Sequence, residues 1–246
     1  MRVLLTNDDG IYADGIKALA AALCQEHEVV IAAPDTERSG AAHSFTMRTP
    51  LRMERVTLSK LPNMEAYAIN GTPADCVKLA LCRLNKPDMV LSGINHGQNL
   101  GTDTSYSGTV CAALESALLG VPAMAVSLTG RKFENFDAAA RVARDMLAKE
   151  SGQMLLNINV PDLPYEQIKG VRYAPLANQI YDGAYCERED PFGAKYFWPA
   201  VGMRYAEQDQ NSDICCVRAG YVAVTPLILD YTDYAGLAAL QKKNVE

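Results

Sequence analysis

Two adjacent aspartates stand near the start of the chain, in the run Asn7-Asp8-Asp9-Gly10 that follows the apolar segment 2–7. In an open α/β sheet, ligands bind beyond the carboxyl ends of the strands. Two adjacent carboxylates repel one another, so a cation between them favours keeping both ionised, and hard oxygen ligands suit Mg²⁺, Mn²⁺ or Ca²⁺. The alternative interpretation is an ordinary Asp-Asp-Gly turn with solvated carboxylates.

Two later loops offer further oxygen ligands. Ser39 stands in the run Arg38-Ser39-Gly40 after the strand-like segment 28–34, where its hydroxyl could bind a metal, although a surface turn is the simpler interpretation. Asn95 stands in a Gly/Asn-rich loop after a third apolar run and offers a neutral amide oxygen. That loop spans about fifteen residues, and connections of this length are usually functional or disordered.

A candidate phosphate site begins at Tyr106-Ser107-Gly108-Thr109, where a helix is predicted to start. Free backbone N–H groups and the positive end of the helix dipole favour an anion there, although plain N-capping by Ser107 is the alternative. We assign phosphate binding to Asn99, Ser107, Gly108 and Thr109. His96 either reaches the phosphate or leaving group or has no special role. Because all these segments follow strands or begin a helix after one, we expect them to gather on one sheet edge.

An alternation of strands and helices positions these segments up to about residue 160. Apolar runs predict buried strands, and helical spacing predicts helices between them, including one with Thr72 as N-cap and Pro73 at its first position. This alternation predicts an α/β fold with a mostly parallel sheet and helices on both faces. After residue 161, extended stretches such as 169–177 and 212–229 predict hairpins or an extended arm, with the pair Cys215-Cys216 in a strand-like, structural context. The predicted strands lie at 2–7, 28–34, 88–93, 122–128 and 153–160, with further extended segments at 45–57 and 65–69.

The composition excludes several classes of function. The formal charge is 23 − 29 = −6, which argues against a nucleic-acid polymer or a membrane surface as partner. Neither a signal peptide nor an apolar run of roughly 18 residues is found, so we expect a cytoplasmic protein. The seven cysteines are odd in number and lack C-x-x-C spacing, which favours reduced thiols over disulfides or a zinc site.

The motifs together resemble the survival protein SurE family of nucleotidases. The resemblance is nearly full-length, and its most specific segments are MRVLLTNDDG, APDTERSG, NGTPADCVKLAL, SGINHGQNLGTDTSYSGTVCAALE, LLNINVP and GYVAVTPL. It implies one SurE-like domain over 1–246, with a Rossmann-like three-layer core over about 1–160. The C-terminal extension, about 161–246, would hold extended hairpins and a terminal helix.

The resemblance also implies an activity and a ligand set. It implies a 5′-nucleotidase that hydrolyses nucleoside 5′-monophosphates, and in some members 3′-monophosphates or short polyphosphate. It places one divalent ion, Mg²⁺ or Mn²⁺, per subunit on Asp8, Asp9, Ser39 and Asn95. The catalytic residues would be Asp8 and Asp9, either of which could accept a proton. It further implies a homodimer or homotetramer in which a C-terminal arm is exchanged. The chain departs from the family at His96 and Ala42, where a small residue and a serine are common, and neither change removes a ligand.

Three competing classes fit less well. A phosphate- or nucleotide-binding regulatory domain of the receiver type, without hydrolytic activity, needs a phosphoacceptor Asp at the end of a later strand, where this chain has Ser92. A dinucleotide-binding oxidoreductase needs G-x-G-x-x-G after the first strand. A phosphatase with an Asp nucleophile needs D-x-D-x-T, which the adjacent pair does not match.

Overall fold

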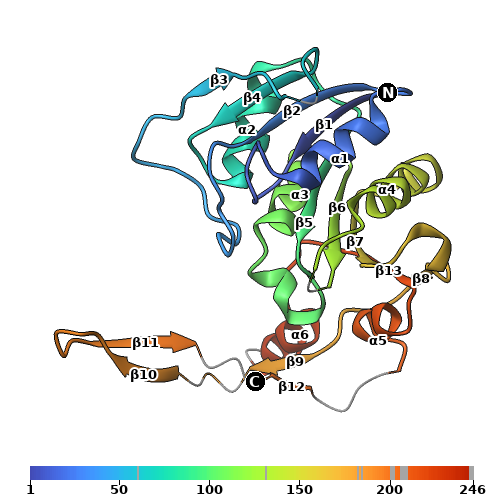
Figure 1. Ribbon diagram of the computed structural model, residues 1–246. Helices are drawn as coiled ribbons and strands as arrows, with labels where there is room; N and C mark the ends of the chain where they lie inside the picture. Colours follow the sequence, from blue (N-terminus) through green and yellow to red (C-terminus); the bar gives the residue numbers. More distant parts are fainter. Residues whose placement is uncertain are drawn as a thin grey trace.

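A computed structural model describes residues 1–59, 61–130, 132–181, 183, 185–199, 203–205 and 210–243 (Figure 1). Its centre is a nine-stranded sheet among the described residues, with strand order β3-β4-β2-β1-β5-β6-β7-β13-β8. The strands are β1 (Arg2–Thr6), β2 (Glu28–Pro34), β3 (Met53–Arg55), β4 (Glu65–Ile69), β5 (Met89–His96), β6 (Ala123–Thr129), β7 (Leu155–Pro161), β8 (Val171–Tyr173) and β13 (Val222–Pro226).

The sheet is parallel from β4 through β7, as the alternation of strands and helices predicts. β1 lies between β2 and β5, so Val3 stands opposite Val29 on one side and Met89 on the other. Among the described strands of this sheet, β3 pairs antiparallel with β4, and β13 pairs antiparallel with β7. The central strands are buried on both faces, which is why they are continuous apolar runs.

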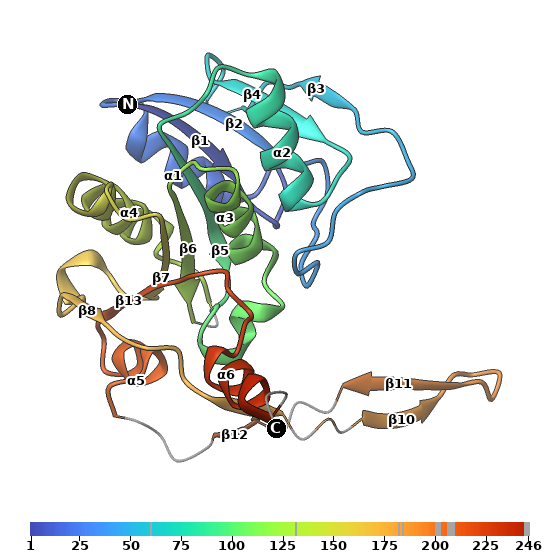
Figure 2. The ribbon, with the colours of Figure 1, turned by 180° about the vertical axis from the view of Figure 1, so that it is seen from behind.

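Helices cover both faces of the sheet. α1 (Asp14–Leu23) and α4 (Phe136–Glu150) pack side by side on one face, and α2 (Pro73–Arg83) and α3 (Gly108–Leu118) pack on the other (Figures 1 and 2). Each helix turns an apolar stripe to the sheet; α1 buries Ile16, Leu19 and Leu23. The two faces therefore have separate hydrophobic cores, which confirms the predicted three-layer arrangement.

The C-terminal part contains antiparallel strand pairs and a final helix, as the sequence predicts. β10 (Tyr185–Glu189) and β11 (Lys195–Pro199) form an antiparallel hairpin that projects from the body (Figures 1 and 2). β9 (Gln179–Tyr181) pairs with β12 (Met203–Tyr205), and the final helix α6 covers Tyr234–Lys243. Short 3₁₀ helices occur at η1 (Gly101–Ser105) and η2 (Tyr165–Gln167).

The prediction of an extended stretch over 212–229 is wrong in its first part, because α5 covers Asp213–Arg218. Asp213 is fully buried at the start of α5, where its carboxylate accepts hydrogen bonds from the backbone N–H groups of Gly101, Ala177 and Ile214. These long-range partners fix a helical turn that the local pattern does not indicate. The pair Cys215-Cys216 consequently lies in a helix, not a strand.

Two other segments differ from the prediction. Only Met53–Arg55 of the stretch 45–57 joins the sheet, because the preceding residues pack instead against α2. The long loop after the third strand is shorter than expected, since β5 continues to His96 and η1 follows. All seven cysteines are free thiols, as predicted. Within the described part of the chain, every helix is too short or too polar to cross a lipid bilayer.

Asp75 joins the start of α2 to the loop that follows Ser39. Thr72 and Asp75 form the capping box at the start of α2, and the Asp75 carboxylate also accepts hydrogen bonds from the backbone N–H and the hydroxyl of Thr46, the latter at 2.6 Å. Burial raises the pKa of Asp75, but the bonds from Thr46 and Thr72 outweigh it and leave the pKa below its ordinary value. The ionised carboxylate therefore stabilises the fold.

The substitution Asp75→Asn should lower the free energy of unfolding by about 1–3 kcal/mol at pH 7, because an amide nitrogen cannot accept these bonds. Since the folded-state pKa is depressed, this contribution is present above the unfolded pKa of about 3.9 and is lost as the pH falls through the folded-state pKa. Urea unfolding at stepped pH values would measure it. Glu54 is exposed, so the control substitution Glu54→Gln should lower the free energy of unfolding by less than about 0.5 kcal/mol. The difference in the free energy of unfolding between the wild type and Asp75→Asn should shrink toward acid pH. A difference that stays constant would contradict this assignment.

Candidate metal and phosphate site

A tight turn after β1 presents the acidic pair. The side chain of Asn7 closes the turn, donating to the Gly10 carbonyl at 2.9 Å and accepting from the Gly10 N–H at 3.2 Å. Gly10 has a φ of +98°, a conformation that L-residues rarely adopt. The N–H of Ile11 then donates to the Pro34 carbonyl at 2.8 Å, so the turn is joined to the end of β2.

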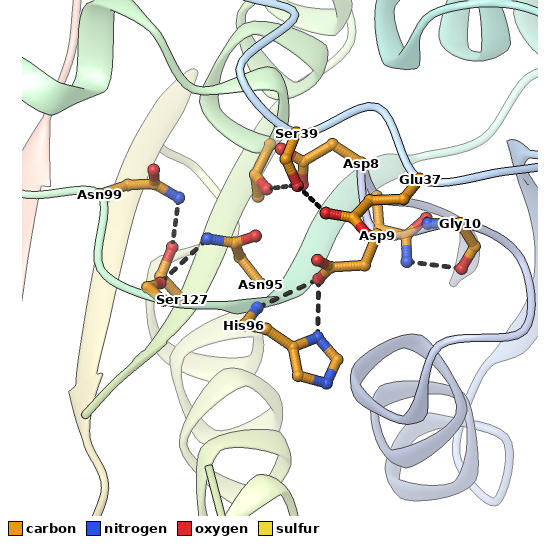
Figure 3. Close-up of polar contacts among 12 residues, drawn as sticks. Asp8, Asp9, Gly10, Glu37, Ser39, Asn95, His96, Asn99 and Ser127 are labelled. Atoms are coloured by element: carbon orange, nitrogen blue, oxygen red, sulfur yellow. Dashed lines mark hydrogen bonds and ion pairs between the residues drawn. The ribbon is translucent and has the colours of Figure 1, made fainter. Parts of the chain in front are cut away.

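Asp8 is buried against the start of α3. Its Oδ1 accepts a hydrogen bond from the Thr109 hydroxyl, and its carbonyl accepts one from the Arg38 N–H at 2.7 Å (Figure 3). Only 4% of Asp8 is exposed. Burial raises the pKa of Asp8 to about 6, and the charge of Asp9 adds to this rise, although the bond from Thr109 opposes it. The site therefore holds a carboxylate whose negative charge is poorly compensated.

Asp9 is held by His96. Its Oδ2 accepts from the backbone N–H of His96 at 3.1 Å and lies 2.9 Å from His96 Nδ1 (Figure 3). Phe133 and Phe136 contact the imidazole edge-on, with ring centroids 5.9 and 4.6 Å away. The hydrogen bond with Asp9 raises the pKa of His96 above its ordinary value, although burial opposes the rise. These two contacts fix the orientation of the Asp9 carboxylate, which lies beside Asn95 (Figure 3).

Asn95 lies beside the acidic pair at the carboxyl end of β5. Its Nδ2 donates to the Gly97 carbonyl at 3.0 Å, and this bond fixes which way the amide faces. Figure 3 shows the Asn95 amide oxygen turned toward the carboxylates of Asp8 and Asp9. The structure thus brings Asp8, Asp9 and Asn95 together from two strands, as the sequence predicts.

Ser39 lies on the exposed loop above Asp8. Its hydroxyl donates to Glu37 Oε1 at 2.7 Å, and the Arg38–Asp8 backbone bond holds the loop over the site (Figure 3). The loop is therefore near the acidic pair, but the Ser39 hydroxyl faces Glu37. The assignment of Ser39 as a metal ligand therefore stays a prediction.

The start of α3 is close to the acidic pair. Ser107 Oγ accepts from the Val110 N–H at 3.1 Å, so Ser107 is the N-cap, as the simpler interpretation of this residue states. A Cβ built on Gly108 would lie 2.9 Å from both Cβ and Oδ2 of Asp8. Thr109 contributes the hydrogen bond to Asp8. The helix dipole therefore points its positive end at the carboxylates and at any anion bound beside them.

Asn99 is buried and bonded within the protein. Its Nδ2 donates to Ser127 Oγ at 2.8 Å, and its backbone carbonyl accepts from the side chains of Asn157 and Asn159 at 2.8 and 3.0 Å (Figure 3). This network holds the loop between β5 and η1 against β6 and β7. A direct contact between Asn99 and phosphate stays a prediction, and the observed bonds give the side chain a supporting role.

One polar cluster beside the site was not predicted from the sequence. His43 Nε2 lies 2.8 Å from Glu115 Oε2, and Lys78 Nζ lies 3.1 Å from Glu115 Oε1. These contacts attach the loop after Ser39 to α2 and α3. His43 and Glu115 are 72 positions apart, so no local spacing indicates the pair. The same holds for His96 and Asp9, whose contact depends on the pairing of β1 with β5.

The donor set fits a hard divalent cation. Asp8, Asp9 and Asn95 offer carboxylate and amide oxygens within one site, and such oxygens suit Mg²⁺ and Mn²⁺. A cation would also neutralise the charge that burial leaves uncompensated on Asp8. Among the described residues, no three His, Cys, Asp or Glu side chains converge on a metal position.

Comparisons with known proteins identify the family to which the chain is similar. The sequence matches the profile of the family described as survival protein SurE over residues 3–183. It is 42% identical to the 5′-nucleotidase SurE of Alkaliphilus metalliredigens over 100% of both chains, and 45% identical to that of Aeromonas hydrophila over 98% of this chain and 97% of the relative. The crystal structure of the SurE protein from Aquifex aeolicus superposes with a TM-score of 0.84 at 38% identity, covering 99% of this chain and 100% of the other.

The close approach of Gly108 to Asp8 allows metal binding by Asp8 to be tested with a single substitution. Gly108→Ala should weaken Mn²⁺ binding by about 10–100-fold, because the added methyl group must displace the carboxylate. Titration of Mn²⁺ followed by electron paramagnetic resonance would measure the affinity. Gly152→Ala is a matched control, since nothing lies within 4 Å of its built Cβ. Equal affinities in the two variants would show that Asp8 does not bind the metal in this position.

Proposed function

The chain belongs to the survival protein SurE family, and from this premise we propose that it is a divalent-metal-dependent 5′-nucleotidase. It hydrolyses nucleoside 5′-monophosphates to a nucleoside and phosphate, and 3′-monophosphates and short polyphosphate are further candidate substrates. The main observation in support of this proposal is that Asp8, Asp9 and Asn95 lie close together beside the start of α3 (Figure 3). Acidic oxygen ligands beside a helix N-terminus suit a phosphate ester held on a cation.

Four residues would hold one Mg²⁺ or Mn²⁺ ion: Asp8, Asp9, Ser39 and Asn95. When bound, the ion would polarise the phosphate and lower the pKa of an attacking water. Asp9 would contribute its oxygen Oδ1, because His96 occupies Oδ2. Ser39 would turn its hydroxyl away from Glu37 to join the set. Octahedral Mg²⁺ keeps several waters, so a small protein ligand set is sufficient.

The start of α3 would hold the phosphate. The backbone of Gly108 and Thr109 and the cap residue Ser107 face the site, and Asn99 supports the preceding loop. Fixed donors of this kind stabilise charge that develops in the transition state. Asp8 or Asp9 would accept the proton from water.

A receiver-like regulatory domain without hydrolysis is the alternative function. It requires a phosphoacceptor aspartate at the end of a strand beside β1. The neighbouring strand β5 has Ser92 paired with Thr6 and ends in Asn95 and His96, so this position carries no carboxylate. An assay for stable aspartyl phosphate would detect such a domain.

We also propose one domain and a homo-oligomer, a dimer or tetramer, in the cytoplasm. β13 and β8 extend the main sheet, which supports treating the C-terminal extension as part of the same domain. The hairpin β10–β11 projects from the body and carries exposed aromatic side chains, with Phe192 96% exposed and Trp198 62% exposed (Figure 2). A partner subunit would cover these side chains if the arm is exchanged.

Asp8→Asn should abolish the EDTA-sensitive release of phosphate from AMP, with a loss of about 10²–10³-fold or more in kcat. The amide keeps the volume of the side chain but removes its charge from the metal site. Phosphate release with Mg²⁺ or Mn²⁺, with and without EDTA, would measure the loss. Asp137→Asn, at an exposed position in the first turn of α4, is the control and should retain activity. Unchanged turnover in Asp8→Asn would refute the proposed metal site.

The single tryptophan, Trp198, reports on the arm. If a partner subunit covers β11, the fluorescence of the native protein should be blue-shifted from that of the unfolded chain and should move to longer wavelength on dilution. Light scattering after size exclusion would give the mass at the same concentrations. A monomer mass with solvent-exposed tryptophan emission at all concentrations would rule out arm exchange.

A further inference from the structure

A hollow of about 790 Å³, lined by both charged and apolar side chains, lies near the proposed metal site, at the carboxyl ends of β6 and β7. Its walls come from the loops that follow β5, β6 and β7 and from the end of α5. The volume is within the range of about 300–1,000 Å³ that is typical of small-molecule sites. The metal site accounts for none of the charged side chains in this hollow.

The hollow adjoins the metal site through the loop that follows β5. Gly97 lines the hollow, and its carbonyl accepts the hydrogen bond from the proposed ligand Asn95 at 3.0 Å (Asn95 is shown in Figure 3). Phe133, which packs against His96, lies in the same loop as the lining residues Lys132 and Glu134. A molecule whose phosphate lies at the metal site can therefore extend its remaining part into the hollow.

The lining is electrically balanced. Lys132 and Arg218 bring two positive charges, and Glu134 and Asp162 bring two negative ones. Such a lining gives no net attraction for an anionic chain, in contrast to a polyphosphate channel, which needs an excess of cations. Gln98 adds an amide that can both donate and accept.

The hollow also has apolar walls, which come from Pro161, Leu163 and Val217. Neutral polar groups next to apolar surface suit a sugar and a heterocyclic base, which have hydroxyls, ring nitrogens and an apolar face.

The wall that contains Gly130, Glu134 and Asn135 is held in place before any ligand binds. Asp162 Oδ1 accepts from the Asn135 N–H at 3.0 Å and from Asn135 Nδ2 at 2.9 Å, and it also lies 3.2 Å from the Glu134 N–H. A Cβ on Gly130 would lie 2.6 Å from Cβ of Asp162, so the loop approaches β7 as closely as a glycine allows. A wall fixed in this way avoids the entropic cost of ordering on binding.

We infer that this hollow binds the nucleoside part of the substrate while the phosphate lies at the metal site. The inference rests on the proposed function and deepens it, because it assigns the specificity-determining contacts to the loops after β5, β6 and β7. Val217 and Gln98 are specificity residues in this arrangement, and neither belongs to the metal or phosphate machinery.

Val217→Trp, which fills the hollow from α5, should raise KM for AMP by about tenfold or more, whereas kcat/KM for p-nitrophenyl phosphate should stay within about twofold. The smaller phenol leaves most of the hollow empty. Gln98→Ala should raise KM for AMP by about fivefold without filling space. Val171 is exposed on β8 and lies outside the hollow, so Val171→Trp is the matched control. It should leave KM for AMP and kcat/KM for p-nitrophenyl phosphate unchanged.

Adenosine binding gives a readout that needs neither metal nor hydrolysis. Saturation-transfer NMR should show adenosine bound to the wild type and to Val171→Trp, and released from Val217→Trp. Three results for Val217→Trp would each overturn the inference. They are equal losses of activity on AMP and p-nitrophenyl phosphate, a larger loss on short polyphosphate than on AMP, and unchanged adenosine binding. Failure of the wild type to hydrolyse either ester would instead refute the proposed function, and adenosine binding would still test the hollow.

Discussion

The burial of Asp8 next to Asp9 is the constraint around which the site is organised. Two neighbouring carboxylates at the end of β1 repel one another, and burial raises the pKa of Asp8 to about 6. The surrounding groups each reduce that repulsion: Thr109 donates to Asp8, and His96 binds Asp9. A residual negative charge nevertheless remains in a partly dehydrated position, and a divalent cation neutralises it better than any single protein group.

This constraint explains why the proposed ligands come from strands that are distant in sequence but adjacent in the sheet. β1 pairs with β2 on one side and β5 on the other, so the loops that follow these three strands meet at their carboxyl ends. α3 begins beside them, because Gly108 allows its first turn to lie against Asp8. The same edge continues to β6 and β7, where the hollow begins. The metal site and the hollow are thus successive parts of one sheet edge.

Local sequence patterns predict the part of the molecule in which strands and helices alternate. The apolar runs at β1, β2, β5, β6 and β7 are long and buried on both faces, and the Thr72–Asp75 capping box marks the start of α2. Patterns fail where a tertiary contact decides the structure, as at α5, which depends on the bonds of Asp213 to Gly101 and Ala177. For the site, motif spacing predicts which loops meet, whereas the contacts of His96 with Asp9 and of His43 with Glu115 depend on strand pairing and loop packing.

The net charge of −6 repels the proposed substrate, which is also an anion. Long-range repulsion is screened over about 8 Å at physiological ionic strength, so binding depends on charges close to the phosphate. A cation on the acidic pair and the positive end of α3 would supply that attraction locally. The balanced charges of the hollow neither increase nor decrease this attraction for the phosphate. In this arrangement charge selects the phosphate, and shape and hydrogen bonding select the nucleoside.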